Sequence, residues 1–168
     1  IMSQYLDSHY MSEVYRIASR SDSLDTHIGA IIVEKTGILV GEGYNHLILG
    51  IEKTDENLGD GDLFFHAESE AVRDFLKLRN PSKPLRFEMP YVMYTNGIPC
   101  LECARVISGI GIARIVVDKS WNDDNSSRWR ESVEKAMKIY RGNNIEIVEW
   151  VGELEEGARK FRRGKYLD

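Results

Sequence analysis

The feature that most constrains the fold of this chain is the alternation of short apolar runs with longer stretches of helical periodicity. Apolar runs of roughly four to eight residues are typical of strands, and amphipathic stretches of about ten or more residues are typical of helices. The expected strands are 29–34, 38–44, 91–95, 114–118 and 145–150, and the expected helices are 5–20, 66–78, 100–110 and 126–140. Lys35-Thr36-Gly37 joins the first two strands, which predicts a hairpin with Gly37 in its turn. The segment 80–84 contains two prolines and is expected to end the second helix.

Helices that lie between successive strands make crossover connections, which join strands that run parallel. The order therefore predicts an α/β sandwich with a mixed sheet, antiparallel at the first hairpin and parallel where helices cross over. The chain has 168 residues, 42% of them hydrophobic, which is enough to bury one core. No linker rich in Pro, Gly or Ser divides it, so we expect a single domain over residues 1–168.

Two segments lie outside this alternation. The stretch 45–65 is polar and contains several glycines, so it is expected to be a long loop, and such loops are usually functional or mobile. The tail from about residue 152 is basic between Arg159 and Lys165. We expect this tail to be helical, with the charged residues on a solvated face.

The charge balance limits the partners. The chain has 27 acidic residues against 22 lysines and arginines, a net charge of −5. This balance argues against nucleic acid as a partner, because phosphate neutralisation requires a basic face, and it is compatible with a small charged ligand. No run approaches the roughly 18 apolar residues of a membrane span, and the N-terminal residues lack the pattern of a signal peptide. We therefore expect a cytoplasmic protein without a membrane partner.

The chain has two cysteines, Cys100 and Cys103, three positions apart. In a reducing compartment a lone disulfide between them is improbable, so metal binding or redox chemistry explains the pair better. Their spacing puts both sulfurs on one face of the expected helix, near its N-terminus, where the thiolate form that binds metal is favoured. A structural zinc knuckle, a redox pair or two buried small residues remain alternatives for this motif alone.

His66, at the start of another expected helix, is the candidate third ligand. A site with one histidine, two cysteines and an open fourth position is typical of catalytic zinc, whereas structural zinc usually has four protein ligands. An isolated histidine is more often a core or surface residue. The combination of His66 and Glu68 with the Pro99-Cys100-x-x-Cys103 motif changes that balance, because it is the signature of zinc-dependent nucleobase deaminases.

The chemistry of these residues supports this interpretation. Zinc held by two thiolates and one imidazole lowers the pKa of a bound water toward neutrality. Glu68 follows His66 by two residues, so its carboxylate can point toward the open position without replacing the imidazole. We expect Glu68 to move protons from the water to the ring nitrogen and then to the departing ammonia.

Three segments of the sequence carry a family resemblance. They are Gly43-Tyr-Asn45, the run His66-Ala-Glu-Ser-Glu-Ala-Val72, and Met93-Tyr-Thr95 leading into Pro99-Cys-Leu-Glu-Cys-Ala-Arg-Val-Ile107. In order and spacing they resemble the cytidine and deoxycytidylate deaminase superfamily, and within it most of all the deoxycytidylate (dCMP) deaminases. The resemblance implies a three-layer α/β/α sandwich with a five-stranded mixed sheet, a Zn²⁺ cofactor, a homo-oligomer, and hydrolysis of dCMP to dUMP and ammonia.

The resemblance also implies contacts with the substrate. Asn45 would hydrogen-bond the sugar, and its alternative is a turn residue. The backbone around Ala67 would meet the pyrimidine carbonyl. The backbone of Ile98, before Pro99, would receive the amino group that is lost.

The chain departs from the dCMP deaminases after Asn45. Those members commonly continue with a glycine and a proline, and here His46 and Ile48 occupy the altered positions. This difference puts in doubt the feedback by dCTP and dTTP that is associated with the loop. His27 stands where a lysine is frequent, and it either contacts phosphate when protonated or caps the following strand.

Three other functions compete with dCMP deamination. The first is deamination of another small base or nucleoside, such as cytidine, guanine or a riboflavin precursor, with the same metal. The second is editing of nucleic acid, which would need an electropositive groove. The third is a non-catalytic, zinc-stabilised binding module, and Glu68 argues against it because a structural zinc site has no use for a proton shuttle.

Overall fold

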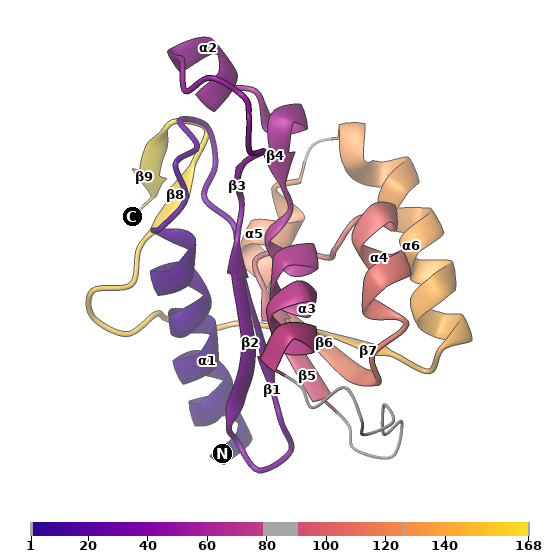
Figure 1. Cartoon of the computed structure of the whole chain (residues 1–168). Coiled ribbons are helices and arrows are strands. Elements are labelled where there is room, and N and C mark those ends of the chain that lie inside the picture. The colour runs from indigo at the N-terminus through magenta and orange to yellow at the C-terminus, as the bar shows by residue number, and fades with distance from the viewer. Residues whose placement is uncertain (1, 79–90, 126, 168) are drawn as a thin grey trace.

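The computed structural model describes residues 2–78, 91–125 and 127–167. Its central sheet has five strands in the order β2-β1-β5-β6-β7 (Figure 1). The strands are β1 (Gly29–Val33), β2 (Leu39–Tyr44), β5 (Tyr91–Thr95), β6 (Ile112–Asp118) and β7 (Glu146–Trp150). The longer helices are α1 (Met2–Ala18), α3 (Ala67–Leu78), α4 (Leu101–Ile107) and α6 (Arg130–Gly142).

The sheet is mixed, as the sequence predicts. Strand β1 lies antiparallel to β2 and to β5, whereas β5, β6 and β7 run parallel to one another. Gly37 in the β1–β2 turn has a φ of 93°, a conformation that L side chains rarely adopt, which confirms the predicted hairpin. Because β5 has an antiparallel neighbour on one side and a parallel one on the other, a crevice is expected at its carboxyl end.

Helices cover both faces of the sheet. Figure 1 shows α1 on one side and α3, α4 and α6 on the other. Alternate strand residues point to opposite faces, so each face has its own buried cluster. The face toward α1 buries Ile31, Val33, Tyr94 and Val116, and the opposite face buries Ala30, Ile32, Met93, Ile115 and Val117. The expected α/β/α sandwich is confirmed.

Two glycines of β2 set the position of α3. A Cβ on Gly43 would lie 2.4 Å from the carbonyl oxygen of Ala67, and a Cβ on Gly41 would lie 2.7 Å from that of Ala71. Both distances are well inside van der Waals contact, so only glycine lets the helix backbone come this close to the strand. The first turn of α3 is therefore held against the carboxyl end of β2.

The stretch 45–65 is more structured than the expected long loop. Its ends pair as two short strands, β3 (His46–Leu47) and β4 (Phe64–Phe65). Between them lie α2 (Asp55–Leu58), which the side chain of Thr54 caps, and the 3₁₀ turn η1 (Gly61–Leu63). Local capping by short polar side chains explains these elements, and such capping leaves no apolar period in the sequence.

The other expected elements are present with shifted ends. Two short elements were not expected, α5 (Lys119–Asp123) and the 3₁₀ turn η2 (Ser127–Trp129), and they precede α6. The predicted helix end at 80–84 lies outside the described residues. Within the described residues, no helix is both long enough and apolar enough to cross a membrane.

The prediction of a helical tail was wrong. Residues 160–167 form a β-hairpin of β8 (Lys160–Arg162) and β9 (Lys165–Leu167). Its two turn residues, Arg163 and Gly164, have φ angles of 53° and 78°, and positive φ at both positions is the pattern of a type I′ hairpin turn. The basic residues indicated a solvent-exposed face, but their spacing did not distinguish a helix from a strand. The Arg163-Gly164 turn makes this segment a hairpin.

Candidate active site

The three predicted metal ligands lie together at the carboxyl end of β5. His66 immediately precedes α3 and Cys100 immediately precedes α4, and their carbonyl oxygens accept helical hydrogen bonds from the N–H groups of Glu70 and Ala104. Cys103 lies in the first turn of α4 and is fully buried. The sequence separates the two motifs by more than thirty residues, and the packing of α3 beside α4 brings them together.

The geometry of this group fits zinc. The Nδ1 atom of His66 lies 3.4 Å from the Sγ atom of Cys100 and 3.4 Å from that of Cys103. All three ligand atoms lie within 4.8 Å of one another. Zinc bonds of about 2.3 Å to sulfur and 2.0–2.1 Å to nitrogen, at tetrahedral angles, place the two atom types roughly 3.6 Å apart. The group could therefore hold a tetrahedral ion with its fourth position open.

The pKa values of the three candidate ligands depend on one another. The Cys103 thiol and the His66 ring both bond the Cys100 sulfur and lower the pKa of Cys100 to about 4. The bond between His66 and Cys100 raises the pKa of His66 to about 9. The separate bond between Cys103 and Cys100, together with burial, raises the pKa of Cys103. The lowered pKa of Cys100 favours a thiolate at this position. Binding of a cation displaces protons from the other two groups.

Glu68 lies beside this group and is almost fully buried, with 8% of its surface exposed. Its Oε2 atom is 3.8 Å from the sulfur of Cys103, and its Oε1 atom is 3.0 Å from the hydroxyl of Thr95. The Thr95 hydroxyl also lies 3.0 Å from the carbonyl oxygen of Gly29. A hydroxyl has one hydrogen, so Thr95 can donate to one of these acceptors at a time. Burial raises the pKa of Glu68 and brings its proton exchange nearer to neutral pH.

His66, Cys100 and Glu68 line one cavity of about 640 Å³, whereas Cys103 is fully buried and does not belong to the lining. This volume is within the range of small-molecule pockets, about 300–1,000 Å³. The lining also includes residues of the segment before β1, of η1 and of the segments after β6. Three arginines also line the cavity, and they are Arg128, Arg162 and Arg163.

The predicted substrate contacts all lie at this cavity. Asn45, Ala67 and Ile98 belong to its lining. The side chain of Asn45 accepts a hydrogen bond from the N–H of Ile28 at 2.8 Å and donates one to the carbonyl of Thr26 at 2.9 Å. These bonds fix the amide and leave it one N–H for a ligand. The roles of the three residues toward a substrate remain predictions.

Two histidines that the sequence singles out lie elsewhere. His27 stacks on Phe161 with 4.1 Å between ring centroids, and its Nε2 atom donates to the carbonyl of Ser23 at 2.9 Å. Burial lowers the pKa of His27, which favours the neutral ring. His46 pairs with Glu70 at 2.9 Å on the outer side of α3. Neither histidine belongs to the cavity lining.

The loop before α4 depends on residues that the sequence did not reveal. Tyr140 of α6 donates to the carbonyl oxygen of Pro99 at 2.8 Å, and Asn122 of α5 accepts from the N–H of Ile98 at 3.1 Å. The hydroxyl of Ser69 lies 3.3 Å from the sulfur of Cys103. Each contact joins segments far apart in the sequence or adds to a ligand already identified, and no local spacing marks them.

The sequence model of one family matches residues 4–119, which is well over half of the chain. That family is described as the cytidine and deoxycytidylate deaminase zinc-binding region. The chain belongs to this family. The matched segment contains Glu68 and all three metal-ligand candidates, and it ends at the first residue of α5, before α6 and the C-terminal hairpin.

Curated relatives carry the name deoxycytidylate deaminase. The protein from Homo sapiens is 27% identical over 144 residues, which are 79% of this chain and 76% of the relative. The protein from Saccharomyces cerevisiae is 27% identical over 132 residues, which are 72% of this chain and 40% of the relative. The chain thus matches about two fifths of the yeast protein's length.

Solved structures share the fold. The dCMP deaminase of cyanophage S-TIM5, crystallised with dCMP and dUMP, has a TM-score of 0.60 at 18% identity, covering 83% of this chain and 93% of the phage chain. RibD of Acinetobacter baumannii has a TM-score of 0.58 at 19% identity, covering 89% of this chain and 36% of RibD. At such identities the similarity shows the fold alone.

Proposed function

We propose that this chain is a zinc-dependent hydrolytic deaminase that converts dCMP to dUMP and ammonia. The observation that carries the proposal is the buried carboxyl of Glu68 beside a group of one histidine and two cysteines, at a cavity of about 640 Å³ that His66, Glu68 and Cys100 line. The names of the human and yeast relatives support dCMP as the substrate.

The residues divide the chemistry between them. His66, Cys100 and Cys103 would hold zinc, which supplies a Lewis acid that activates water at neutral pH. Glu68 would accept one proton of that water and deliver it to the pyrimidine nitrogen. It would then take the proton of the added hydroxyl group and deliver it to the amino group, which leaves as ammonia. Its low exposure favours both steps, because a carboxyl whose pKa is raised toward neutrality can both take and return a proton.

The cavity walls would hold the nucleotide in place for these steps. Asn45 would bond the sugar, since its amide is already fixed by Ile28 and Thr26. Ala67 opens α3, so its backbone N–H has no partner within the helix and can bond the pyrimidine carbonyl. The backbone of Ile98 would receive the leaving amino group.

A substrate panel tests the proposal. Zinc-loaded protein is incubated with cytosine, adenine and guanine nucleosides and nucleotides and with a diaminopyrimidine riboflavin precursor, and ammonia release is measured. We expect the highest kcat/KM for dCMP, with dUMP as the product on chromatography. If ammonia is released only from a different base, the assignment of dCMP as the substrate is wrong, but the assignment of deaminase activity stands. No release from any compound by protein with one zinc per chain would overturn both.

A further inference from the structure

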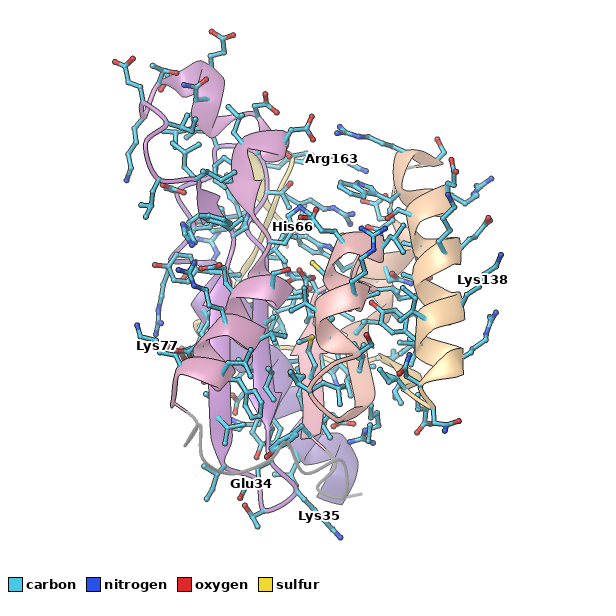
Figure 2. The ribbon with its side chains drawn as sticks, turned by 45° about the vertical axis from the view of Figure 1, so that its right-hand side comes forward. Glu34, Lys35, His66, Lys77, Lys138 and Arg163 are labelled. Atoms are coloured by element: carbon cyan, nitrogen blue, oxygen red, sulfur yellow. The ribbon has the colours of Figure 1, made fainter. Side chains whose placement is uncertain are left out.

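The C-terminal hairpin brings two arginines into the cavity that contains the metal-ligand group. Arg162 ends β8 and Arg163 begins the turn, and both line the cavity together with Arg128 of η2. Figure 2 shows Arg163 above His66. We propose that these three arginines form the subsite for the 5′-phosphate of the nucleotide, an inference that rests on the proposed deaminase function.

Arg162 is the buried member of this cluster, with 9% of its surface exposed. Its guanidinium donates to the carbonyl oxygen of Trp121 at 2.8 Å and to the side-chain oxygen of Asn125 at 2.7 Å, and it stacks over the Trp121 ring at 4.4 Å. Two neutral acceptors use two of its five N–H groups. The nearest carboxylate that pairs with it, that of Asp124, is 3.5 Å away and largely exposed. Arg162 is thus a buried positive charge in a cavity, and its nearest carboxylate neutralises it only weakly. Such a group is suited to binding an anionic ligand.

Arg163 lies at the rim and has a strained backbone. Its φ of 53° is the left-handed conformation, which costs an L residue roughly 1–2 kcal/mol. The side chain of Asp124 orients its guanidinium at 3.2 Å, and the carbonyl of Asp124 accepts a second bond at 3.1 Å. Glycine or asparagine would suit this backbone conformation better.

The hairpin tip docks beside the residue that is predicted to bond the sugar. The N–H of Gly164 donates to the carbonyl of Asp25 at 2.7 Å, and that of Arg163 lies 3.4 Å from the Thr26 hydroxyl. Thr26 is also the residue whose carbonyl Asn45 bonds. Asn45 and Arg163 are thus both neighbours of Thr26. In a nucleotide the phosphate is attached to the sugar, so adjacent sugar and phosphate contacts are the required arrangement.

The carboxylates of the same wall are already bonded within the protein. Asp62 pairs with Arg128 at 3.0 Å, and both side chains are more than two thirds exposed, so a phosphate can displace this weak pair. Asp25 accepts from the Thr26 hydroxyl, and Asp60 accepts from the N–H of Asp62. Arginine binds phosphate through two parallel N–H groups, which a carboxylate partner on one side does not block.

The test compares a nucleotide with its nucleoside. For the Arg163→Gln variant, kcat/KM is measured with dCMP and with deoxycytidine, which lacks the phosphate. We expect the ratio of the two to fall by about ten- to a hundredfold, through KM, because a charge-assisted hydrogen bond is lost. Arg159→Gln is the matched control, because Arg159 stacks on Tyr166 and does not line the cavity, and its ratio stays at the wild-type value. Arg128→Gln gives a second measurement if the first variant does not fold.

A binding measurement separates this proposal from the proposed function. Inorganic phosphate is titrated calorimetrically into the wild type and into Arg163→Gln, without any turnover. Weaker phosphate binding by the variant, by about tenfold, supports the subsite even if no cytosine compound is deaminated. Equal phosphate binding by both proteins overturns the subsite, as does a wild type that deaminates dCMP and deoxycytidine equally well. In that last case the deaminase function stands.

Discussion

The metal-ligating side of the cavity and its arginine-lined side differ in how the chain builds them. On the first side, His66 and Cys100 each precede a helix, and Cys103 follows Cys100 within one helical turn. On the second side, Arg128 belongs to the 3₁₀ turn η2 and Arg162 to β8, which are as far apart in sequence as His66 and Cys100, but neither arginine belongs to a short sequence motif. The family match covers the first side and ends before the second.

The difference shows which kind of function each side can carry. A metal site needs ligand atoms at fixed distances, and helix starts packed on a sheet supply that rigidity. The arginine side is attached through the hairpin, where Lys160 forms a 2.6 Å ion pair with the buried carboxylate of Asp118. Tyr15 of α1 donates to the same carboxylate at 2.7 Å. We infer that the first side performs the reaction and the second selects the substrate.

The largest expected effect follows from loss of a metal ligand. In Cys103→Ser the hydroxyl replaces a thiolate, so zinc content should fall well below one per chain and ammonia release should fall to background. Metal analysis and a turnover assay check this. Wild-type protein that is stripped with a chelator should lose activity and regain it with added zinc. Full zinc and activity in Cys103→Ser would contradict the assignment of the metal side.

The next effect concerns the proton shuttle. Glu68→Gln keeps the side-chain volume and removes the titrating group, so turnover should fall at least about a hundredfold while zinc content is unchanged. Glu70→Gln is the matched control, because Glu70 lies on the same helix and pairs with His46 away from the cavity. Near-normal turnover of Glu68→Gln with a slightly lower melting temperature would leave Glu68 as a charge at the helix N-terminus, worth about 0.3–1 kcal/mol.

The first side could be predicted from sequence because its information is local. The spacing of Cys100 and Cys103, the position of Glu68 after His66, and the apolar runs of the strands are all short-range patterns. They predicted the sheet, its mixed direction and the helices that carry the ligands. The structure brings these side chains together, and the roles assigned to them remain to be tested.

The second side could not be predicted because its information is in tertiary contacts. The charged tail suggested a helix, whereas the Arg163-Gly164 turn and the stacking of Phe161 on His27 make it a hairpin. Its anchor, the ion pair of Lys160 with Asp118, joins residues 42 positions apart, and no periodicity marks such a pair. Capping by Thr54 likewise made a helix within the expected loop.

A smaller effect is expected when α3, the helix that carries Glu68, is displaced without changing any metal ligand. In Gly43→Ala the new methyl group would lie 2.4 Å from the carbonyl oxygen of Ala67, so the first turn of α3 must move. We expect a loss of about 1–3 kcal/mol in the free energy of unfolding and roughly tenfold lower turnover, because Glu68 moves with the helix. Denaturant unfolding and kinetics measure both. Gly142→Ala is the control, since a Cβ there meets no atom within 4 Å, and unchanged behaviour of both variants would show that α3 tolerates displacement.

The smallest expected effect on turnover comes from weakening the attachment of the hairpin that carries Arg162 and Arg163. In Lys160→Met the buried carboxylate of Asp118 loses its ion-pair partner, which should lower stability by about 1–3 kcal/mol. Arg162 keeps its bonds to Trp121 and Asn125, so the hairpin opens only part of the time, and the preference for dCMP over deoxycytidine should fall on the order of twofold to fivefold. Zinc content and deoxycytidine turnover should stay near wild type, because no metal ligand touches the hairpin. Lys165→Met, on the exposed strand of the same hairpin, controls for loss of a positive charge. Equal loss of turnover on dCMP and deoxycytidine in Lys160→Met would show that the two sides act as one unit, and the division into a reacting side and a selecting side would then be wrong.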